Sequence, residues 1–426
     1  MLDIKLIREQ PEIVRNNLMK RGAAEKLLML DDLIDFDKDW RKSIAQLNEL
    51  RRRRNVVTAE IAKLKSKGED ASEKIREAEK IPDEIKKLEE KVEEYRDKID
   101  HILLRLPNLL HESVPLGKDE NDNVPIRRWG EIPKFDFPAK DHIDLGLSLD
   151  IMDIERASKI SGARFYYLKN EAVMLDMALI HFALGELKKK GFIPIEPPFL
   201  MRRKPYEGVT DLGDFQEMLY KVEDEDLYLI ATSEHSIAAM FMDEILDADD
   251  LPQKYVGVSP CFRREAGAHG KDTKGIFRTH QFNKVEQFIF CKPEDSWTFH
   301  EELIRNAEEI FQKLELPYRI VNVCTGDIGT VAAKKYDLEA WMPAQKIYRE
   351  VVSCSNCTDY QARRLNIKYR EGEGKPPKEC VHTLNSTAIA TSRTIVAILE
   401  NYQQKDGSVA IPEVLKPHMG GIEKIG

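Results

Sequence analysis

The sequence predicts an α+β protein in which an antiparallel hairpin of two long helices precedes a domain built on an antiparallel sheet. Apolar residues recur in alternating steps of three and four from Leu33 to Leu64 and again from Ile81 to Leu106, which is the heptad spacing of packed helices. Between Tyr228 and Ser353, short β-branched and aromatic runs alternate with polar loops. This second pattern is typical of strands flanked by helices.

The length of the chain indicates two domains. At 426 residues it exceeds the size at which a single hydrophobic core stops growing. The heptad pattern stops at Pro107, and the chain then becomes rich in proline and glycine. We therefore expect a helical arm over residues 1–110 and a second domain over residues 111–426.

The predicted arm has an uneven charge. A Gly-containing turn at residues 66–70 separates two seams of similar length, and about 35 residues per helix would project about 50 Å. Residues 41–67 include nine basic and two acidic side chains, so the run Arg51–Arg54 has few acids nearby. A basic rod suits recognition of an RNA backbone. A coiled coil that only joins two copies of the chain would explain the seam but not this charge.

The composition favours a cytoplasmic protein with no membrane contact. Six scattered cysteines form no disulfide framework, which indicates a reducing compartment. Residues 1–5 do not lead into the apolar core of a signal peptide. The most apolar stretch, residues 172–187, contains Asp176 and His181 and is too short to span a bilayer. The net charge of −9 argues only weakly against a nucleic-acid partner.

The second domain contains one clear amphipathic helix, expected over residues 172–190. Strands are expected over residues 228–231, 254–259, 285–291, 318–323 and 347–353. The segment 267–272 is not a phosphate-binding P-loop, because it has Asp where that loop requires Ser or Thr. Bound ATP would therefore be held by side chains on a sheet.

Four short segments of the second domain carry the groups that such a nucleotide site needs. They are residues 261–265, 278–286, 349–353, and 384–387 leading to Arg393. Each places a positive charge, a carboxylate or an amide in a stretch that otherwise has the composition of a strand. Arginine binds phosphate and carboxylate bidentately, and nearby carboxylates bind Mg²⁺ or an amine. This set of groups is suited to activating an amino acid with ATP.

The ordered set of segments resembles the class II aminoacyl-tRNA synthetases. Residues 262–265 are similar to motif 2, residues 191–198 to motif 1 with Pro198 at its proline, and the run ending at Arg393 to motif 3. Within the class, the resemblance is to the seryl-tRNA synthetase family, and it covers nearly the whole chain. It is carried by Thr232-Ser233-Glu234, Arg278-x-His280-Gln281-Phe282, residues 353–364 and His382-Thr383-Leu384-Asn385. The chain departs from the usual family pattern in two places. Residues 386–393 contain no glycine, and the arm contains Pro82.

The resemblance implies a serine–tRNA ligase that uses ATP and Mg²⁺, acts on tRNA(Ser) and also tRNA(Sec), and forms a homodimer through residues 191–198. The implied catalytic residues are Arg263 and Arg393. The implied ATP-binding residues are Arg263, Arg264, Glu265, Arg278, Thr279, His280, Gln281, Phe282, Glu350, Val351, Val352, Ser353 and Arg393. The implied serine-binding residues are Thr232, Ser233, Glu234, Arg263, Glu286, Asn385 and Thr387. The implied Mg²⁺ ligands are Glu350 and Ser353, and the implied tRNA-binding residues are Arg51, Arg52, Arg53 and Arg54.

The resemblance also implies a role for each key side chain. Arg263 bridges the α-phosphate and the serine carboxylate, while Arg278 and Arg393 bind the outer phosphates. Phe282 stacks on adenine opposite the Arg393 guanidinium, and Glu265 recognises the adenine amine. The serine carboxylate is already charged, so catalysis needs alignment and charge neutralisation and not a general base.

Three other interpretations remain open from the sequence. An adenylating paralogue that loads a carrier protein would not need the basic arm. A non-catalytic RNA-binding protein on the same fold would be expected to lose Arg263, Glu350 or Arg393, and all three are present. A zinc site is suggested by four residues with ligand-like spacing, although the spacer of the second pair is too short. These residues are Cys354, Cys357, Cys380 and His382.

Overall fold

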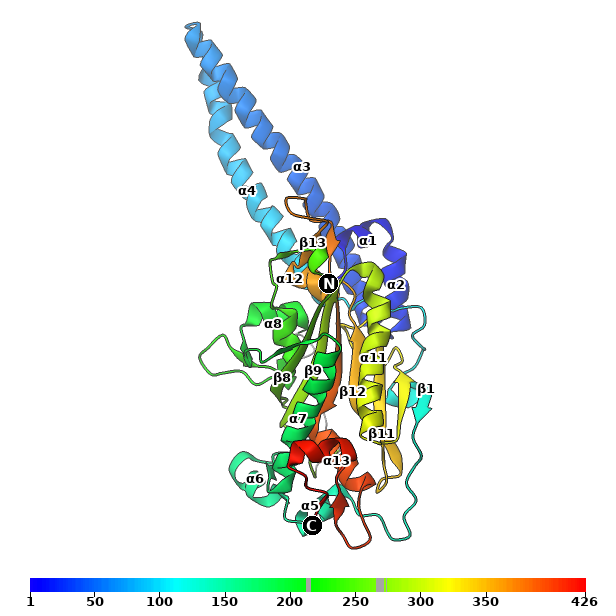
Figure 1. The fold of residues 1–426 in the computed structure, drawn as a ribbon. Helices are drawn as coiled ribbons and strands as arrows, with labels where there is room; N and C mark the ends of the chain where they lie inside the picture. Colours follow the sequence, from blue (N-terminus) through cyan, green and yellow to red (C-terminus); the bar gives the residue numbers. More distant parts are fainter. Residues whose placement is uncertain (212–215, 266–271, 273) are drawn as a thin grey trace. The chain divides into compact units, whose positions relative to one another are not determined.

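The computed structural model describes residues 1–211, 216–265, 272 and 274–426 (Figure 1). Most of the segment 267–272, which the sequence excludes as a P-loop, lies outside the described residues. The chain divides into two compact units, one of residues 2–106 and one of Met1 with residues 107–426.

The first unit is entirely helical. Its helices are α1 (Ile4–Glu9), α2 (Pro11–Lys20), α3 (Glu25–Ser66) and α4 (Ser72–Leu103). The long helices α3 and α4 form the predicted antiparallel hairpin, and the turn between them includes Gly68 with a positive φ of 71°. Helix α4 continues through Pro82 without a break.

The hairpin has its own apolar seam. Leu47, Val57, Ile81 and Ile85 are each at most 7% exposed and form one cluster. Burial of such side chains contributes roughly 1.5–3 kcal/mol each relative to exposure. The distal hairpin is therefore stabilised by contacts within residues 47–85 and their partly buried neighbours.

The first unit contains an ion-pair cluster around a buried carboxylate, which the heptad pattern did not predict. Asp37 is 3% exposed. It accepts hydrogen bonds from Arg8 at 2.6 Å and from Arg41 at 2.9 Å. Removing a partner from a buried charge is costly, so this cluster fixes α1 against α3.

The second unit is built on one eight-stranded sheet with the order β1-β10-β11-β12-β15-β9-β8-β4. Its strands are β1 (Val124–Trp129), β4 (Ile193–Ile195), β8 (Gln253–Phe262), β9 (Gln281–Cys291), β10 (Tyr318–Asn322), β11 (Lys334–Met342), β12 (Ile347–Asn356) and β15 (His382–Ala390). Neighbouring strands are antiparallel, with one correction to the expected pattern: the short edge strand β4 is parallel to β8. Helix α7 (Glu171–Lys189) leads into β4, and residues 196–252 connect β4 to β8, which is long enough for the crossover that parallel pairing requires.

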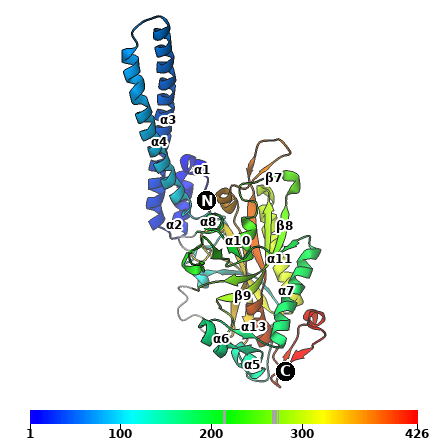
Figure 2. The same cartoon turned by 90° about the vertical axis from the view of Figure 1, so that its left-hand side faces the viewer.

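Helices cover both faces of the sheet. Figure 2 shows α7 and α11 (Ser296–Lys313) on one side of the sheet and α8 (Arg203–Val209) and α10 (Ser233–Ala238) on the other. The main core lies on the α7 and α11 side, where α13 (Thr391–Asn401) also packs. A second, smaller core lies under α8, α10 and α12 (Tyr360–Leu365). The remaining elements are α5 (His142–Ser148), β2 (Met152–Asp153), α6 (Ile154–Ser161), β3 (Tyr167–Leu168), β5 (Leu200–Met201), β6 (Tyr228–Leu229), β7 (Ile245–Asp247), β13 (Lys368–Arg370), β14 (Glu379–Cys380), β16 (Val409–Ala410) and β17 (Lys424–Ile425), with short 3-10 turns between them.

The predicted helix and strands are present, but one central strand was missed. The helix expected over residues 172–190 is α7, and the expected strands correspond to β6, β8, β9, β10 and β12. Strand β11 was not predicted. Its charged residues Lys335, Asp337 and Glu339 alternate with buried apolar ones. One of its faces packs in the core, and the other carries these charges, of which Lys335 lines a polar cavity.

Candidate active site

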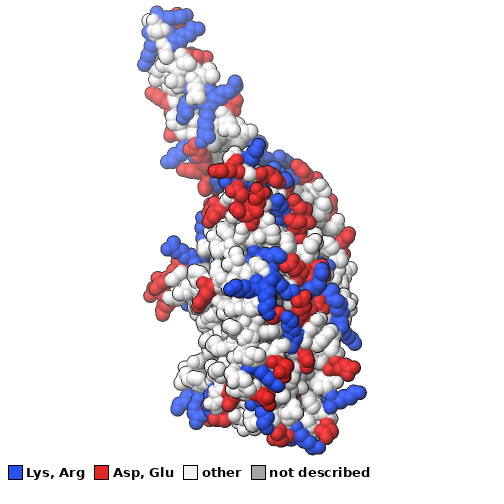
Figure 3. All heavy atoms as spheres, viewed as in Figure 1, with Lys and Arg blue, Asp and Glu red and all other residues white. Residues whose placement is uncertain are grey.

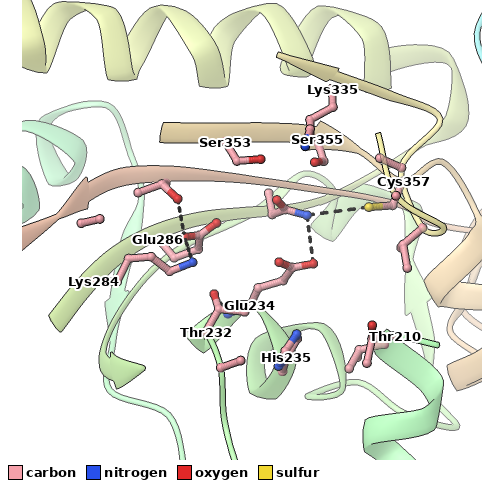
Figure 4. Close-up of a pocket in the computed structure, with 18 of the residues that line it drawn as sticks. Thr210, Thr232, Glu234, His235, Lys284, Glu286, Lys335, Ser353, Ser355 and Cys357 are labelled. Atoms are coloured by element: carbon pink, nitrogen blue, oxygen red, sulfur yellow. Dashed lines mark hydrogen bonds and ion pairs between the residues drawn. The ribbon is translucent and has the colours of Figure 1, made fainter. Parts of the chain in front are cut away.

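A cavity of about 550 Å³ opens on the face of the sheet that α8 and α10 cover. Its walls come from β9, β11, β12 and β15, the ends of β6 and β8, helix α10 and the segment 328–332. Figure 4 shows the lining side chains of these strands pointing toward those of α10. Eleven of the sequence-predicted site residues line the cavity. They are Thr232, Glu234, Arg263, Phe282, Glu286, Glu350, Val351, Ser353, Asn385, Thr387 and Arg393.

The pleat and register of the sheet explain why polar residues gather on this face. Successive side chains of a strand point to opposite faces, so Ser353 and Ser355 of β12 share one face. Ser355 pairs with Asn385 of β15, and Thr387 of β15 pairs with Glu286 of β9. Three adjacent strands therefore contribute polar side chains to one floor, while their alternate residues lie in the apolar core.

Glu234 projects into the cavity from the first turn of α10. The Thr232 hydroxyl caps this helix by accepting a hydrogen bond from the Glu234 backbone N–H at 3.2 Å. The Glu234 Oε1 atom accepts from Asn385 Nδ2 at 3.0 Å and from Gln361 Nε2 at 3.1 Å. Burial, and then the nearby charge of Glu286, raise the pKa of Glu234 to about 7.

Lys284 is a buried site residue that the sequence interpretation missed. Its Nζ atom lies 2.6 Å from Glu286 Oε2, and both side chains are less than 10% exposed. The Thr387 hydroxyl donates to the same Oε2 atom at 3.1 Å. The two-residue spacing of Lys284 and Glu286 on one strand was the available signal, because it places both side chains on the same face.

Two arginines of the cavity wall lie where a smaller hollow adjoins it, and each lies near an aromatic ring. Arg263 Nε donates to the Ala231 carbonyl at 3.3 Å, and its guanidinium lies 5.2 Å from the centre of the Phe282 ring. Arg393 Nη1 donates to the Glu350 carbonyl at 3.0 Å, and its guanidinium lies 5.0 Å from the centre of the Phe277 ring. Both distances are within the range of cation–π attraction.

Glu350 presents a carboxylate beside these arginines. Enclosure in the cavity alone would raise its pKa, but Arg393, Lys335 and Arg263 together hold the pKa below its ordinary value. Glu350 is therefore ionised at neutral pH. Lys335 was also missed from the sequence, because it lies on the unpredicted strand β11.

The smaller hollow adjoins the cavity at these arginines. It is lined by Arg263, Glu265, Phe277, Arg278, Thr279, Phe282, Ser392 and Arg393. Arg278 Nη1 donates to Glu265 Oε2 at 3.0 Å. Asp272 accepts from Arg349 at 2.5 Å and lies 3.9 Å from Arg278. Three sequence-predicted residues, Glu265, Arg278 and Thr279, thus lie beside the cavity and not in its wall.

The other predicted site residues lie outside both hollows. Arg264 and Gln281 are exposed. His280 Nδ1 donates to the Arg263 carbonyl at 2.7 Å. Ser233 is fully buried in α10, and Val352 packs in the apolar core on the opposite face of β12. These five residues therefore line neither the cavity nor the smaller hollow.

The arm arginines are better neutralised than the sequence indicated. Arg51 pairs with Glu89 at 2.7 Å, Arg52 with Glu49 at 2.9 Å and Arg53 with Glu77 at 2.6 Å. The sequence count missed the acids of the facing helix α4, which the hairpin brings alongside α3. The three arginines remain 48–74% exposed, and exposed ion pairs of this kind contribute little stability. Figure 3 shows basic side chains near the tip of the hairpin, with acidic ones mixed in farther down.

The four residues with zinc-like spacing make other contacts. Cys357 accepts a hydrogen bond from Asn385 at 3.7 Å, and Cys354 donates to the His300 carbonyl at 3.8 Å. His382 Nδ1 lies 2.9 Å from the Ser296 hydroxyl. Among the described residues, no three His, Cys, Asp or Glu side chains gather in a way that could hold a metal ion. In the same part of the chain, every helix is too short or too polar to cross a membrane.

Comparison with known proteins places the chain in a family. The model "Seryl-tRNA synthetase N-terminal domain" matches residues 1–110, and "tRNA synthetase class II core domain (G, H, P, S and T)" matches residues 220–402. Serine–tRNA ligases of Methanocella arvoryzae and Methanospirillum hungatei are 57% and 58% identical over 99% of this chain and 100% of their own length. The chain belongs to the seryl-tRNA synthetase family.

Solved structures agree with this membership. The seryl-tRNA synthetase of Pyrococcus horikoshii, complexed with ATP, is 56% identical, covers 100% of this chain and 99% of its own, and has a TM-score of 0.96. The cytoplasmic enzyme of Naegleria fowleri, in complex with AMP, is 38% identical with a TM-score of 0.90 over 100% and 98% of the two chains. The family resemblance and the α+β fold with its helical arm, both predicted from the sequence, are confirmed.

Proposed function

We propose that this seryl-tRNA synthetase, a serine–tRNA ligase, binds L-serine and ATP in the cavity above the sheet and transfers the activated serine to tRNA(Ser). The observation that carries the proposal is that one cavity holds carboxylates and guanidinium groups in different parts of its wall. Arg263 and Arg393 lie where the smaller hollow adjoins the cavity, and Glu234 and Glu286 line the cavity without lining that hollow. Relatives with ATP and AMP bound support ATP as the second substrate.

The carboxylate part of the wall has the groups that recognise serine. The Glu234 carboxylate faces the cavity and would bind the substrate ammonium group. Thr387 and Glu286, joined at 3.1 Å, would hydrogen-bond the serine hydroxyl. Alanine has no hydroxyl to make these bonds, and a site that hydrogen-bonds the substrate hydroxyl can reject an analogue that lacks it by a large factor.

The arginine part of the wall and the smaller hollow have the groups that recognise ATP. Arg263 would contact both the serine carboxylate and the α-phosphate, which brings the reacting groups together. Arg278 and Arg393 would bind the outer phosphates, and Phe282 offers a ring on which adenine can stack. Glu265, held by Arg278 at 3.0 Å, would accept from the adenine amine.

The reaction proceeds by two substitutions. A serine carboxylate oxygen attacks the α-phosphorus, and pyrophosphate leaves with the electron pair of the broken P–O bond. A ribose hydroxyl of the terminal adenosine of tRNA then attacks the acyl carbon, and AMP leaves. The first step develops negative charge on the phosphates, and fixed arginines stabilise that charge without reorganisation.

The residues around Glu350 fit a magnesium ion. Glu350 and Ser353 offer a carboxylate and a hydroxyl, the hard oxygen donors that Mg²⁺ prefers. Asp337 lies opposite Ser353 in the sheet, is 4% exposed, and has an Oδ1 atom without a hydrogen-bond partner among the described residues. Glu350 and Ser353 would hold the ion, which would neutralise phosphate charge.

The cellular setting follows from the reaction. Charging of tRNA takes place where proteins are synthesised, so we place the enzyme in the cytoplasm. All six cysteines are buried, and none of them forms a disulfide among the described residues, as expected in a reducing compartment.

Replacing Arg263 with alanine should abolish serine activation. Loss of one preorganised donor to transition-state charge typically lowers the rate by about 10²–10³-fold. Serine-dependent ATP–pyrophosphate exchange measures the effect. The matched control is Arg305→Ala, because Arg305 is exposed on α11, lines neither hollow and should be dispensable. Equal activity of the two variants would remove Arg263 from the reacting centre.

Serine activation should weaken on the acid side of about pH 7. The pKa of Glu234 is raised to about 7, so the carboxylate is protonated below that pH and loses its attraction for the ammonium group. The measurement is kcat/KM for serine as a function of pH between about pH 5.5 and 8.5, because this ratio reports the free enzyme. Its fall toward low pH is the acid limb. Glu234→Gln should lower kcat/KM and remove the limb; a limb that persists would belong to another group.

Shortening the hairpin should separate the two half-reactions. Replacing residues 45–90 with a short Gly-Ser link removes the seam cluster of Leu47, Val57, Ile81 and Ile85 as a whole and leaves the Asp37 cluster in place. Pyrophosphate exchange should survive, because the cavity lies entirely in the other unit. Transfer to tRNA should collapse, and normal transfer would show that the arm is a spacer.

A milder variant tests the binding of tRNA phosphates directly. If Arg54 neutralises one phosphate, Arg54→Gln should reduce the slope of the logarithm of the tRNA binding constant against the logarithm of the salt concentration by about 0.7–0.9. Lys405→Gln, a change of an exposed lysine in the second unit, serves as control. An unchanged salt slope would show that Arg54 does not bind the tRNA backbone.

The synthetase should form a homodimer through its edge strand. Val173, Met174 and Met177 of α7 and Ile193 of β4 are 39–54% exposed, and exposed apolar patches mark interaction surfaces. Light scattering at micromolar concentration should give twice the chain mass. Met177→Glu should shift the enzyme toward monomer, whereas a monomeric wild type would refute the assignment.

A further inference from the structure

One fully buried side chain outside the cavity wall contacts the proposed serine-binding carboxylate. Gln361, on α12, is 0% exposed. Its Nε2 atom donates to Glu234 Oε1 at 3.1 Å and to the Val209 carbonyl at 3.1 Å. Its Oε1 atom accepts from the Thr383 hydroxyl at 2.7 Å. Every polar atom of this amide therefore has a partner.

These contacts allow only one orientation of the amide. The Val209 carbonyl can only accept, so the nitrogen end of Gln361 must face it. The same nitrogen then has one hydrogen left, which points to Glu234. A flipped amide would place two acceptors together at both Val209 and Glu234. Gln361 is thus a fixed donor to the carboxylate.

The donor pattern makes the Glu234 carboxylate asymmetric. Gln361 and Asn385 both donate to Oε1, at 3.1 and 3.0 Å, and neither bond uses Oε2. Two donors on one oxygen fix the plane of the carboxylate and leave the other oxygen for a ligand. Both bonds also favour the ionised carboxylate over the protonated form.

We propose that Gln361 is a positioning residue for serine recognition, which acts from outside the cavity by fixing the Glu234 carboxylate for contact with the substrate ammonium group. This inference rests on the proposed function. It extends the serine site to α12, a helix that the cavity does not touch, and it explains why a glutamine is buried there among apolar neighbours.

The charges around Glu234 do not change when Gln361 is replaced. Glu286 and Lys284 face Glu234 from β9, Arg263 faces it from the end of β8, and the Cys357 thiol lies beyond Asn385. The His235 imidazole, on the same helix as Glu234, is neutral because burial lowers its pKa to about 3. Glutamine is uncharged at all pH values, so its replacement alters the hydrogen bond alone.

The first test replaces Gln361 with methionine, which keeps the length of the side chain and removes the donor. Loss of a hydrogen bond to a charged group corresponds to about a 10–100-fold rise in KM for serine, with KM for ATP changed less than about twofold. The acid limb of kcat/KM for serine should move up by about one to two pH units, because the protonated form of Glu234 is no longer disfavoured.

Thr383→Val is the matched control. It removes the hydroxyl that supports Gln361 but leaves the bond from Nε2 to Glu234, so thermal stability should fall while the acid limb keeps its position. Gln361→Leu is a second uncharged variant. It also lacks both donors, so the limb should again move upward.

A binding measurement separates recognition from chemistry. Calorimetry with a non-hydrolysable seryl-sulfamoyl adenosine should show weaker binding to both Gln361 variants, while AMP binding stays unchanged. The inference would be overturned if folded variants kept the acid limb of kcat/KM at the same pH, or if KM rose equally for serine and ATP. Gln361 would then be a packing residue. A wild-type enzyme without serine-dependent exchange would instead overturn the proposed function, and this inference with it.

Discussion

The register of the central strands is the constraint on which the site depends. Thr387 lies opposite Glu286, and Ser355 lies opposite Asn385. A slip of one residue between any two of these strands would turn the polar set into the core and the apolar set into the cavity. The register is held by the apolar face, where the alternate residues Leu384 and Ile289 are fully buried. Packing on one side of the sheet therefore fixes the chemistry on the other.

The cavity also has to hold like charges close together before any substrate arrives. Burial and Glu286 work against ionisation of Glu234, while Lys284 and Arg263 favour it. Lys284 contacts Glu286 at 2.6 Å and so reduces the cost of placing two carboxylates in one part of the cavity. A serine ammonium group would complete this balance. The site is thus organised for a substrate with a positive and a negative end, because it already presents the complementary charges.

The sequence predicted the parts of the structure that depend on local patterns. The heptad spacing predicted the hairpin, and the amphipathic pattern predicted α7. The motif segments at Arg263, Glu350 and Arg393 meet at one cavity. Such residues could be found because their chemical type and their neighbours in sequence are informative together. The remaining features depend on pairings between distant segments, which a single sequence does not show. Lys335 was missed because β11 mixes charged and apolar residues and was not predicted as a strand. Gln361 lies in one of the motif segments but was not predicted to belong to the site, because its three partners come from α8, α10 and β15.

The division of the chain into two units fits the demands of the two half-reactions. In the proposed function, activation takes place in the cavity, whose charges are held in place by one sheet with cores on both faces. Binding of a large polyanion requires an exposed surface whose charges can exchange partners. The arm arginines meet that requirement because their acidic partners are on the surface and are held weakly. A phosphate can replace Glu89 or Glu77 at small cost, whereas Glu234 could not lose its amide donors without losing its orientation.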